Sequence, residues 1–437
     1  MNESPKGVAI YGAGVAGKSL ARYLLNQCDE KVCFFLDDNP QLAGTEIIGI
    51  PIESATELES MFSCIKALYI AMPSTSPKKM NIIREAAAKL AIPVLIVPNV
   101  GQIMLGRNLS DVIDLRDLIR DEQTREIESL DSLAKYKSVL VVGGAGSIGV
   151  KIAEQLTINT DLEVIVFDSS ELGIYHAKKL LLSTQRWVGR GKCYLGNAID
   201  YASIVEVIRR HNIDLVINAA AYKHVTIVEE NPIVAAKNNI LSACVVAQAS
   251  MDCNVKDMIF ISTDKAVRPT SLMGATKNVG ELIVAIAERQ ARARDSNTRF
   301  SAVRFGNVLG SSGSVLHVFR EQLEKGGPLT ITHKNVNRYF MTMDEAARLV
   351  LVVTGFMQGS RVYLLRMGEP ILIRDLAERL AKAHGLRLVD GEISCSEEVS
   401  VIYTQLGDGE KIEEELLVTK ASESTDIQSV FMERINL

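Results

Sequence analysis

Four consecutive polar residues, Ser262-Thr263-Asp264-Lys265, directly follow an apolar segment at 258–261 that predicts a buried strand. In an open α/β sheet, side chains just past the carboxyl end of a strand point into the ligand crevice. A carboxylate beside an ammonium in a desolvated crevice can divide the roles of acid and base, provided that the lysine loses its proton. Thr263, Asp264 and Lys265 are therefore candidate catalytic residues, and the competing interpretation is a solvated turn.

A second pair of candidates, Met273 and Lys277, has the spacing at which hydride-transferring dehydrogenases carry a catalytic tyrosine and, four residues later, a lysine. A thioether cannot accept a proton, so the acid and the base must come from elsewhere, and Asp264 and Lys265 are adjacent. Lys277 can still bind the ribose of a nicotinamide. The competing interpretation makes Met273 an ordinary core residue.

A glycine-rich turn, Gly143-x-x-Gly146-x-x-Gly149, lies between a predicted strand at 138–142 and a predicted helix. Such a turn lets the backbone approach a pyrophosphate, whose charge the helix N-terminus then meets. Asp168, about 20 residues on at the end of the next strand, is placed to bind the adenosine ribose. Ser169 follows it without an adjacent arginine for a 2′-phosphate, which favours NAD over NADP. The competing interpretation is a turn that only packs a helix on a sheet.

A second glycine turn spans 12–17, between strands predicted at 8–11 and 32–36, and Asp37 follows the latter. A lone G-x-G-x-x-G is weak evidence, so a nucleotide site, a regulatory site and a packing turn stay open. Further strands are predicted at 67–70 and 94–97.

These elements predict an α/β protein with three parts: an N-terminal Rossmann-like nucleotide-binding domain at 1–107, a helical linker at 108–137, and a catalytic domain at 138–437. In the catalytic domain, later strands are predicted at 164–167, 215–218, 258–262 and 301–305. Helices at 317–325 and 373–384 belong to a C-terminal lobe expected to bind substrate, and 326–339 reads as a polar loop.

Composition excludes several classes of protein. A net charge of -5 gives no electrostatic case for nucleic acid, and seven scattered cysteines without a C-x-x-C pair indicate a reducing compartment and no structural zinc. No apolar run approaches the ~18 residues of a membrane span. We expect a soluble cytoplasmic protein without a metal site.

Five stretches, which span most of 138–418, form longer motifs: 141–149, Asn218-Ala219-Ala220-Ala221-Tyr222-Lys223-His224-Val225, 262–277, Arg304-Phe305-Gly306-Asn307-Val308-Leu309-Gly310-Ser311-Ser312-Gly313-Ser314 and Arg338-Tyr339-Phe340-Met341-Thr342. With them the chain resembles the sugar-nucleotide 4,6-dehydratases of bacterial polysaccharide and glycan synthesis, which are extended short-chain dehydrogenases. The resemblance implies two Rossmann-like doubly wound parallel sheets, the second with the extended short-chain dehydrogenase fold and a small C-terminal lobe.

The resemblance also implies UDP-N-acetylglucosamine as substrate and a recycled NAD. Hydride transfer would oxidise C4, which acidifies the C5 proton; water then leaves across C5 and C6, and the hydride returns to C6. Lys265 would take the C5 proton, Asp264 would protonate the departing hydroxyl, and Thr263 would bind the C4 hydroxyl. Asn307 and Arg338 match positions that hold the diphosphate.

The remaining expected contacts follow from the same resemblance. Lys223 is expected to bind both cofactor and substrate, and Asn197, where an aspartate commonly meets the adenine, can still accept that hydrogen bond. The full set of expected cofactor residues is Gly143, Gly146, Ser147, Ile148, Gly149, Asp168, Ser169, Asn197, Ala198, Ala219, Ala220, Ala221, Lys223, Asn239 and Lys277.

The chain resembles the long form of this family, which normally follows a group of membrane helices; those helices are missing from the sequence. It has Gly407-Asp408 where the family usually has Arg-Pro before Gly409-Glu410-Lys411. We expect a configuration-retaining enzyme and a homo-oligomer. Two alternatives stay open: a sugar-nucleotide 4-epimerase, which would want tyrosine at 273, and a non-enzymatic NAD-sensing protein.

Overall fold

The computed structural model describes residues 7–27, 31–54, 65–71, 83, 92, 94–96, 129–311, 313–365, 367, 369–384, 386–393, 395, 398–415, 423–425 and 430–435. The chain forms two compact units. The first comprises Met1–Gln123, Val318–Ile331 and Arg374–Ile402, and the second comprises Thr124–His317, Thr332–Ile373 and Tyr403–Leu437.

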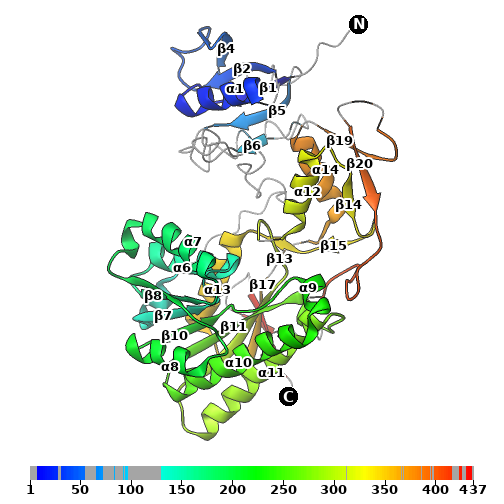
Figure 1. Ribbon diagram of the computed structural model, residues 1–437. Coiled ribbons are helices and arrows are strands. Elements are labelled where there is room, and N and C mark those ends of the chain that lie inside the picture. The colour runs from blue at the N-terminus through cyan, green and yellow to red at the C-terminus, as the bar shows by residue number, and fades with distance from the viewer. Residues whose placement is uncertain are drawn as a thin grey trace. The chain divides into compact units, whose positions relative to one another are not determined.

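The first unit contains a six-stranded sheet (Figure 1). Its strand order is β3 (Glu46–Ile47), β4 (Ile50–Ser54), β2 (Val32–Asp37), β1 (Gly7–Tyr11), β5 (Ile65–Ile70) and β6 (Val94–Ile96), with helix α1 (Val15–Gln27) after β1. All neighbours pair in parallel except β3 and β4. The four strands predicted in this region are present, although position 97 lies outside the described residues.

The same unit holds a small three-stranded sheet of β14 (Leu329–Ile331), β20 (Glu398–Tyr403) and β19 (Arg387–Asp390). Two helices belong largely to this part of the chain, α12 (Val315–Glu324) and α14 (Ile373–Ala383). Both helices were predicted, but β14 and the later strand β15 (Asn337–Arg338) fall in the stretch predicted as a polar loop. Strands of two or three residues are too short to show the alternation by which a sequence reveals a strand.

The second unit is built on a nine-stranded sheet. Its core runs in parallel in the order β9 (Gly191–Leu195), β8 (Glu163–Asp168), β7 (Ser138–Val142), β10 (Leu215–Asn218), β11 (Asp257–Thr263), β12 (Arg299–Phe305) and β17 (Arg361–Leu365). The antiparallel strands β22 (Val430–Arg434) and β21 (Glu423–Ser424) extend the edge beyond β17. The strand order reverses between β7 and β10, which is the place where sheets of this kind bind ligands.

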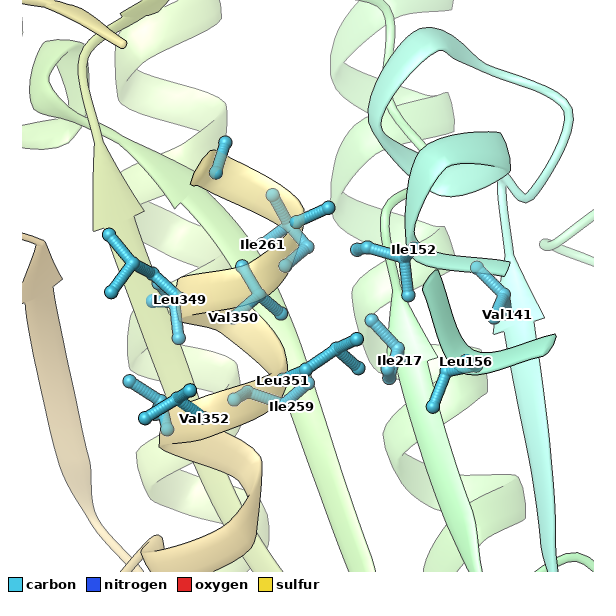
Figure 2. Packing of buried hydrophobic residues seen from close by; sticks show 14 of the residues in the cluster. Val141, Ile152, Leu156, Ile217, Ile259, Ile261, Leu349, Val350, Leu351 and Val352 are labelled. Atoms are coloured by element: carbon cyan, nitrogen blue, oxygen red, sulfur yellow. The ribbon is translucent and has the colours of Figure 1, made fainter. Parts of the chain in front are cut away.

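Helices cover both faces of this sheet, as the side chains of β7 show, because they point alternately to one face and the other. Val139 and Val141 pack toward α6 (Ser147–Asn159) and α13 (Met343–Phe356), and Figure 2 shows this layer. Leu140 and Val142 pack on the other face, toward α8 (Tyr201–Arg210), α10 (Pro232–Asp252) and α11 (Leu272–Ala293). Helices α7 (Glu171–Ser183) and α9 (Val225–Glu230) complete the unit. The predicted doubly wound α/β fold is therefore confirmed.

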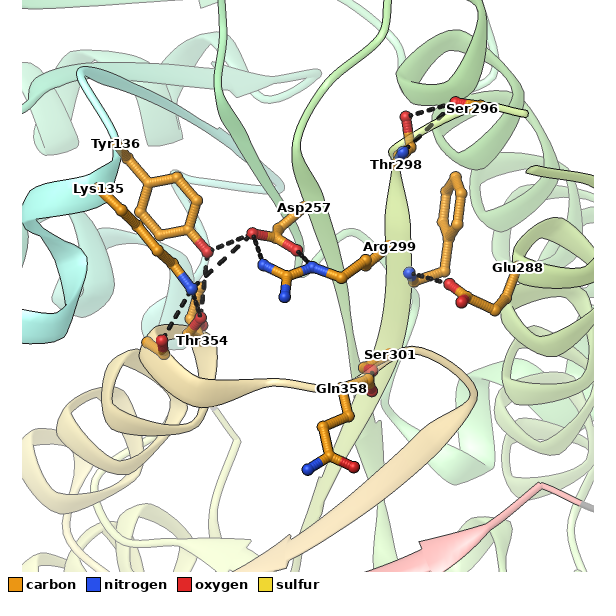
Figure 3. A network of polar contacts seen from close by, with 12 residues as sticks. Lys135, Tyr136, Asp257, Glu288, Ser296, Thr298, Arg299, Ser301, Thr354 and Gln358 are labelled. Atoms are coloured by element: carbon orange, nitrogen blue, oxygen red, sulfur yellow. Dashed lines mark hydrogen bonds and ion pairs between the residues drawn. The ribbon is translucent and has the colours of Figure 1, made fainter. Parts of the chain in front are cut away.

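A polar network around the buried Asp257 ties the amino ends of β11 and β12 to the segment before β7 (Figure 3). The Asp257 carboxylate accepts two hydrogen bonds from Arg299 at 2.7 Å and one from the Tyr136 hydroxyl at 2.6 Å. Tyr136 follows a short 3-10 helix, η4 (Asp131–Lys135). This network lies at the opposite end of the strands from Thr263, so it stabilises the sheet without touching the candidate site.

Residues 108–128 of the predicted helical linker lie outside the described residues. The boundaries of the predicted domains stay predictions. None of the helices in the described part of the chain combines the length and hydropathy of a membrane span.

Candidate active site

The predicted catalytic residues lie together where β11 ends. Thr263 is the last residue of that strand, and a short 3-10 helix, η6 (Asp264–Ala266), begins directly after it. The carboxylate oxygen Oδ1 of Asp264 accepts a hydrogen bond from the Thr263 hydroxyl at 2.8 Å and one from Nζ of Lys265 at 3.0 Å. The three residues thus form one connected polar group at the carboxyl edge of the sheet.

Asn307 joins this group from the next strand. It follows β12 and begins the short strand β13 (Asn307–Val308), and its amide oxygen accepts a hydrogen bond from Nζ of Lys265 at 2.9 Å. Its backbone N–H donates to the Tyr339 carbonyl at 2.9 Å, which fixes its position. The sequence predicted that Asn307 holds a diphosphate; the structure brings it into contact with the candidate base.

Asp264 is completely buried, and its second oxygen has no hydrogen-bond partner among the described residues. A Cβ atom on the neighbouring Gly306 would lie 3.0 Å from this oxygen. A buried carboxyl oxygen without a partner is costly, so such an atom marks a place where a proton or a ligand hydroxyl is accommodated. An acid that protonates a departing hydroxyl needs such an oxygen, free to carry a proton toward the ligand.

Met273 and Lys277 lie one turn apart on α11, and both are buried. Met273 packs in a small apolar cluster with Val228 of α9 and Ala235 of α10. Nζ of Lys277 donates to the Ile261 carbonyl at 2.8 Å, and burial lowers the pKa of Lys277 to about 8 although Glu281 opposes this. The methionine therefore has apolar surroundings, and the lysine is held against the backbone near the carboxyl end of β11.

The glycine turn after β7 has the geometry that a dinucleotide requires. Gly143 has a φ of 71°, and a Cβ atom there would lie 2.5 Å from the backbone nitrogen of Ala220, so only glycine fits. Gly146 is the N-cap of α6, and no side chain caps that helix. An uncapped helix N-terminus beside closely packed backbone suits a pyrophosphate.

Asp168 ends β8, as predicted. Its two oxygens accept hydrogen bonds from the backbone of Ala145 at 3.0 Å and of Ser170 at 2.9 Å. A carboxylate has about four lone-pair sites, so it can also accept bonds from a ribose. The glycine turn and Asp168 therefore fit NAD.

Asn239 uses its amide within the protein. It exchanges hydrogen bonds with the backbone of Tyr222 at 2.8 and 3.0 Å and donates to the Thr276 hydroxyl at 3.0 Å, which anchors the loop after β10 to α11. The structure places the other predicted cofactor residues as follows: Ser147 and Ile148 open α6, Gly149 packs on the Gly143 carbonyl, Ser169 is exposed after β8, Asn197 and Ala198 follow β9, and Ala219, Ala221 and Lys223 follow β10.

Arg338 is buried, and its donors are directed at the C-terminal segment 407–415. Its guanidinium donates to the Ile412 carbonyl and to the Glu410 carboxylate, each at 3.0 Å. Lys411 of that segment donates to the Val267 carbonyl at 2.9 Å, just past η6. The predicted contact of Arg338 with a diphosphate stays a prediction, and its visible role is to hold the Gly409-Glu410-Lys411 segment beside the site.

Sequence reasoning missed Glu414, which this segment brings to Lys265: one Glu414 oxygen lies 3.8 Å from Nζ. The only available signal was the nearby Gly-Glu-Lys motif. It also missed the buried support behind the site, in which Glu281 accepts hydrogen bonds from the Ser262 hydroxyl at 2.5 Å and from Arg304 at 2.7 Å. Nothing in the local sequence pairs these distant residues.

The model of one family, described as polysaccharide biosynthesis protein, matches residues 139–434. The chain belongs to this family. It is 33% identical over 428 residues to the probable polysaccharide biosynthesis protein EpsC of Bacillus subtilis. The alignment covers 93% of this chain and 68% of EpsC.

A second relative carries an enzyme name. The chain is 32% identical over 247 residues, 56% of its own length and 71% of the relative's, to the UDP-N-acetylglucosamine 4,6-dehydratase (inverting) of Campylobacter jejuni. The expected retention of configuration at C5 therefore finds no support, because this relative is named for inversion.

Solved structures show the same fold. Pen from Bacillus thuringiensis has a TM-score of 0.60 and 29% identity, over 68% of this chain and 87% of Pen. The dTDP-glucose 4,6-dehydratase DesIV from Streptomyces venezuelae, solved with NAD bound, has a TM-score of 0.50 and 20% identity, over 62% of this chain and 88% of DesIV.

Proposed function

We propose that this protein is an NAD-dependent 4,6-dehydratase of UDP-N-acetylglucosamine. The observation that carries the proposal is the connected group of Thr263, Asp264, Lys265 and Asn307 at the carboxyl ends of β11 and β12. An acid and a base side by side, with no tyrosine at position 273, suit the loss of water better than simple dehydrogenation. The name of the dehydratase relative supports the substrate.

In this proposal each residue has one role. Thr263 binds the C4 hydroxyl, Lys265 removes the C5 proton once C4 is a ketone, and Asp264 gives a proton to the C6 hydroxyl, which leaves as water. A proton then returns to C5. When bound, NAD would supply the reversible hydride acceptor that takes a hydride from C4 and returns it to C6, so the reaction loses one water and is redox-neutral overall. Gly143, Asp168 and Lys277 would hold it.

The surroundings of Met273 argue against a 4-epimerase. That reaction returns the hydride to the carbon it left and would want a tyrosine hydroxyl at this position. Met273 instead packs among apolar side chains. For C5 we propose inversion, which the name of the relative favours.

The test is to incubate the purified protein with UDP-N-acetylglucosamine in deuterated water and follow the sugar by NMR. We expect a new C6 methyl signal without coupling to C5, because C5 takes its hydrogen from solvent. Absence of a 6-deoxy signal would overturn the proposal. The coupling constants around the ring of the same product made in ordinary water decide between inversion and retention.

A matched pair of variants assigns the base. Lys265→Ala should abolish turnover while NAD stays bound, whereas Lys256→Ala should leave turnover near the wild-type rate. Lys256 is an exposed lysine that pairs with Asp214 at 3.0 Å, away from the carboxyl ends of the strands. A Lys265→Ala enzyme with a near-normal rate would refute the assignment.

A further inference from the structure

Glu414 is a buried acid at the site to which the proposed mechanism gives no role. Its side chain is 4% exposed, and one carboxyl oxygen lies 3.8 Å from Nζ of Lys265. The other oxygen is buried and has no hydrogen-bond partner among the described residues. Its neighbour Glu413 is exposed and accepts a hydrogen bond from the Asn337 side chain at 2.8 Å.

The fold holds Glu414 in this place from both sides. Ile412 accepts hydrogen bonds through its carbonyl from the backbone of Asn337 and from Arg338, each at 3.0 Å. Glu415 pairs with Arg268 at 2.6 Å, beyond the other end of η6. A side chain that is fixed and buried beside a candidate base, at this distance, acts on the charge of that base.

Dehydration requires a change in the charge state of the Asp264–Lys265 pair, and Glu414 can influence this change. The 3.0 Å contact between Nζ of Lys265 and Oδ1 of Asp264 is an ion pair. Dehydration needs the proton on Asp264, as an acid, and a free amine at Lys265. The proton can move along this hydrogen bond, from Nζ to Oδ1, without leaving the site.

A second negative charge beside Lys265 would oppose that transfer, because a nearby carboxylate stabilises the ammonium. The groups that face Glu414 are Lys265, Asp264, Arg338 and Lys411. Burial and Asp264 raise the pKa of Glu414, against the three cations, and the net direction is upward. A buried oxygen without a partner agrees with a carboxyl group that keeps its proton.

We propose that Glu414 is a positioning residue that stays a neutral carboxylic acid, so that Lys265 faces one negative charge and can pass its proton to Asp264. The inference rests on the proposed dehydration. It predicts that ionisation of Glu414 at high pH holds Lys265 as ammonium and slows the reaction.

The first experiment measures the state of Glu414 without any turnover. Infrared spectra of protein labelled with ¹³C-glutamate should show a protonated carboxyl band at neutral pH. The band should disappear in Glu414→Gln and persist in the matched control Glu413→Gln. Absence of the band from the wild-type protein would overturn the proposal.

The second experiment measures kcat against pH. Glutamine mimics the neutral acid, so Glu414→Gln should keep kcat within about threefold at neutral pH and move the decline at high pH upward by about one unit or more. A decline at the same pH in wild type and Glu414→Gln, or no decline in wild type, would overturn the proposal. If the infrared band is present but no 6-deoxy sugar forms, the proposed function fails while the charge state of Glu414 stands.

Discussion

Nζ of Lys265 lies 2.9 Å from the amide oxygen of Asn307, although the two residues are 42 positions apart in the sequence. They follow the adjacent parallel strands β11 and β12, whose carboxyl ends meet at the same edge of the sheet. The contact gives Lys265 a neutral partner in addition to Asp264. A neutral partner fixes the lysine without adding a charge that would hold its proton.

Asn307→Asp tests this relationship. A carboxylate at the same place should stabilise the ammonium of Lys265, so we expect kcat at neutral pH to fall about tenfold or more, with partial recovery at higher pH. The measurement is kcat and KM from pH 6 to 10. If Asn307 acts on the diphosphate alone, KM will rise and the pH profile of kcat will not move.

Gly143→Ala should remove cofactor binding. A Cβ atom there would meet the Ala220 backbone at 2.5 Å, so the turn must distort. Gly189→Ala is the matched control, because Gly189 also has a positive φ, 82°, but has nothing within 4 Å of its Cβ position. We expect a loss of NAD binding by calorimetry in the first variant only; equal affinities would show that the close approach is unimportant.

Met273→Leu should leave the enzyme active. Leucine has a similar volume and fits the apolar cluster, so the free energy of unfolding should change by less than about 1.5 kcal/mol and kcat by less than about threefold. Urea denaturation and initial rates provide the measurement. A fall in kcat of more than about tenfold at unchanged stability would show that the sulfur takes part in the reaction.

Lys277 should make stability depend on pH in a defined window. Its pKa is about 8 in the folded protein against an ordinary 10.5, so between these values the unfolded chain binds more protons and stability rises with pH. The free energy of unfolding of wild type minus that of Lys277→Met, without cofactor, should therefore rise by roughly 3 kcal/mol across this window. A difference that stays constant with pH would contradict the lowered pKa.

Asp257→Ala should destabilise the protein strongly without changing the site. It takes one acceptor from the buried Tyr136 hydroxyl, which keeps the Thr354 carbonyl, and removes the partner of the Arg299 guanidinium, which is 44% exposed, so we expect a loss of about 1–3 kcal/mol. Glu206→Ala removes an exposed ion pair with Arg210 and should leave the free energy of unfolding nearly unchanged. Similar losses in both variants, measured by denaturation, would refute the importance of the buried network.

The sequence by itself determined the fold class and most of the candidate catalytic group. Local patterns can be recognised in a single sequence. Three such patterns were available here: apolar strands of four or more residues, the glycine turn at 143–149 and the polar residues after β11. Thr263, Asp264 and Lys265 could be predicted together because they are consecutive, and Met273 and Lys277 because a fixed helical spacing joins them.

Only the tertiary structure decided which distant residues complete the group. The contact of Lys265 with Asn307 depends on the register of β11 and β12, and its approach to Glu414 depends on the anchoring of Ile412 to Arg338. These relationships arise from strand order and from a segment that returns to the site about 150 residues after Lys265. No periodic pattern in a sequence predicts such a long-range contact. The contacts of Lys265 with the Asn307 amide and the buried Glu414 were therefore visible only in the folded chain.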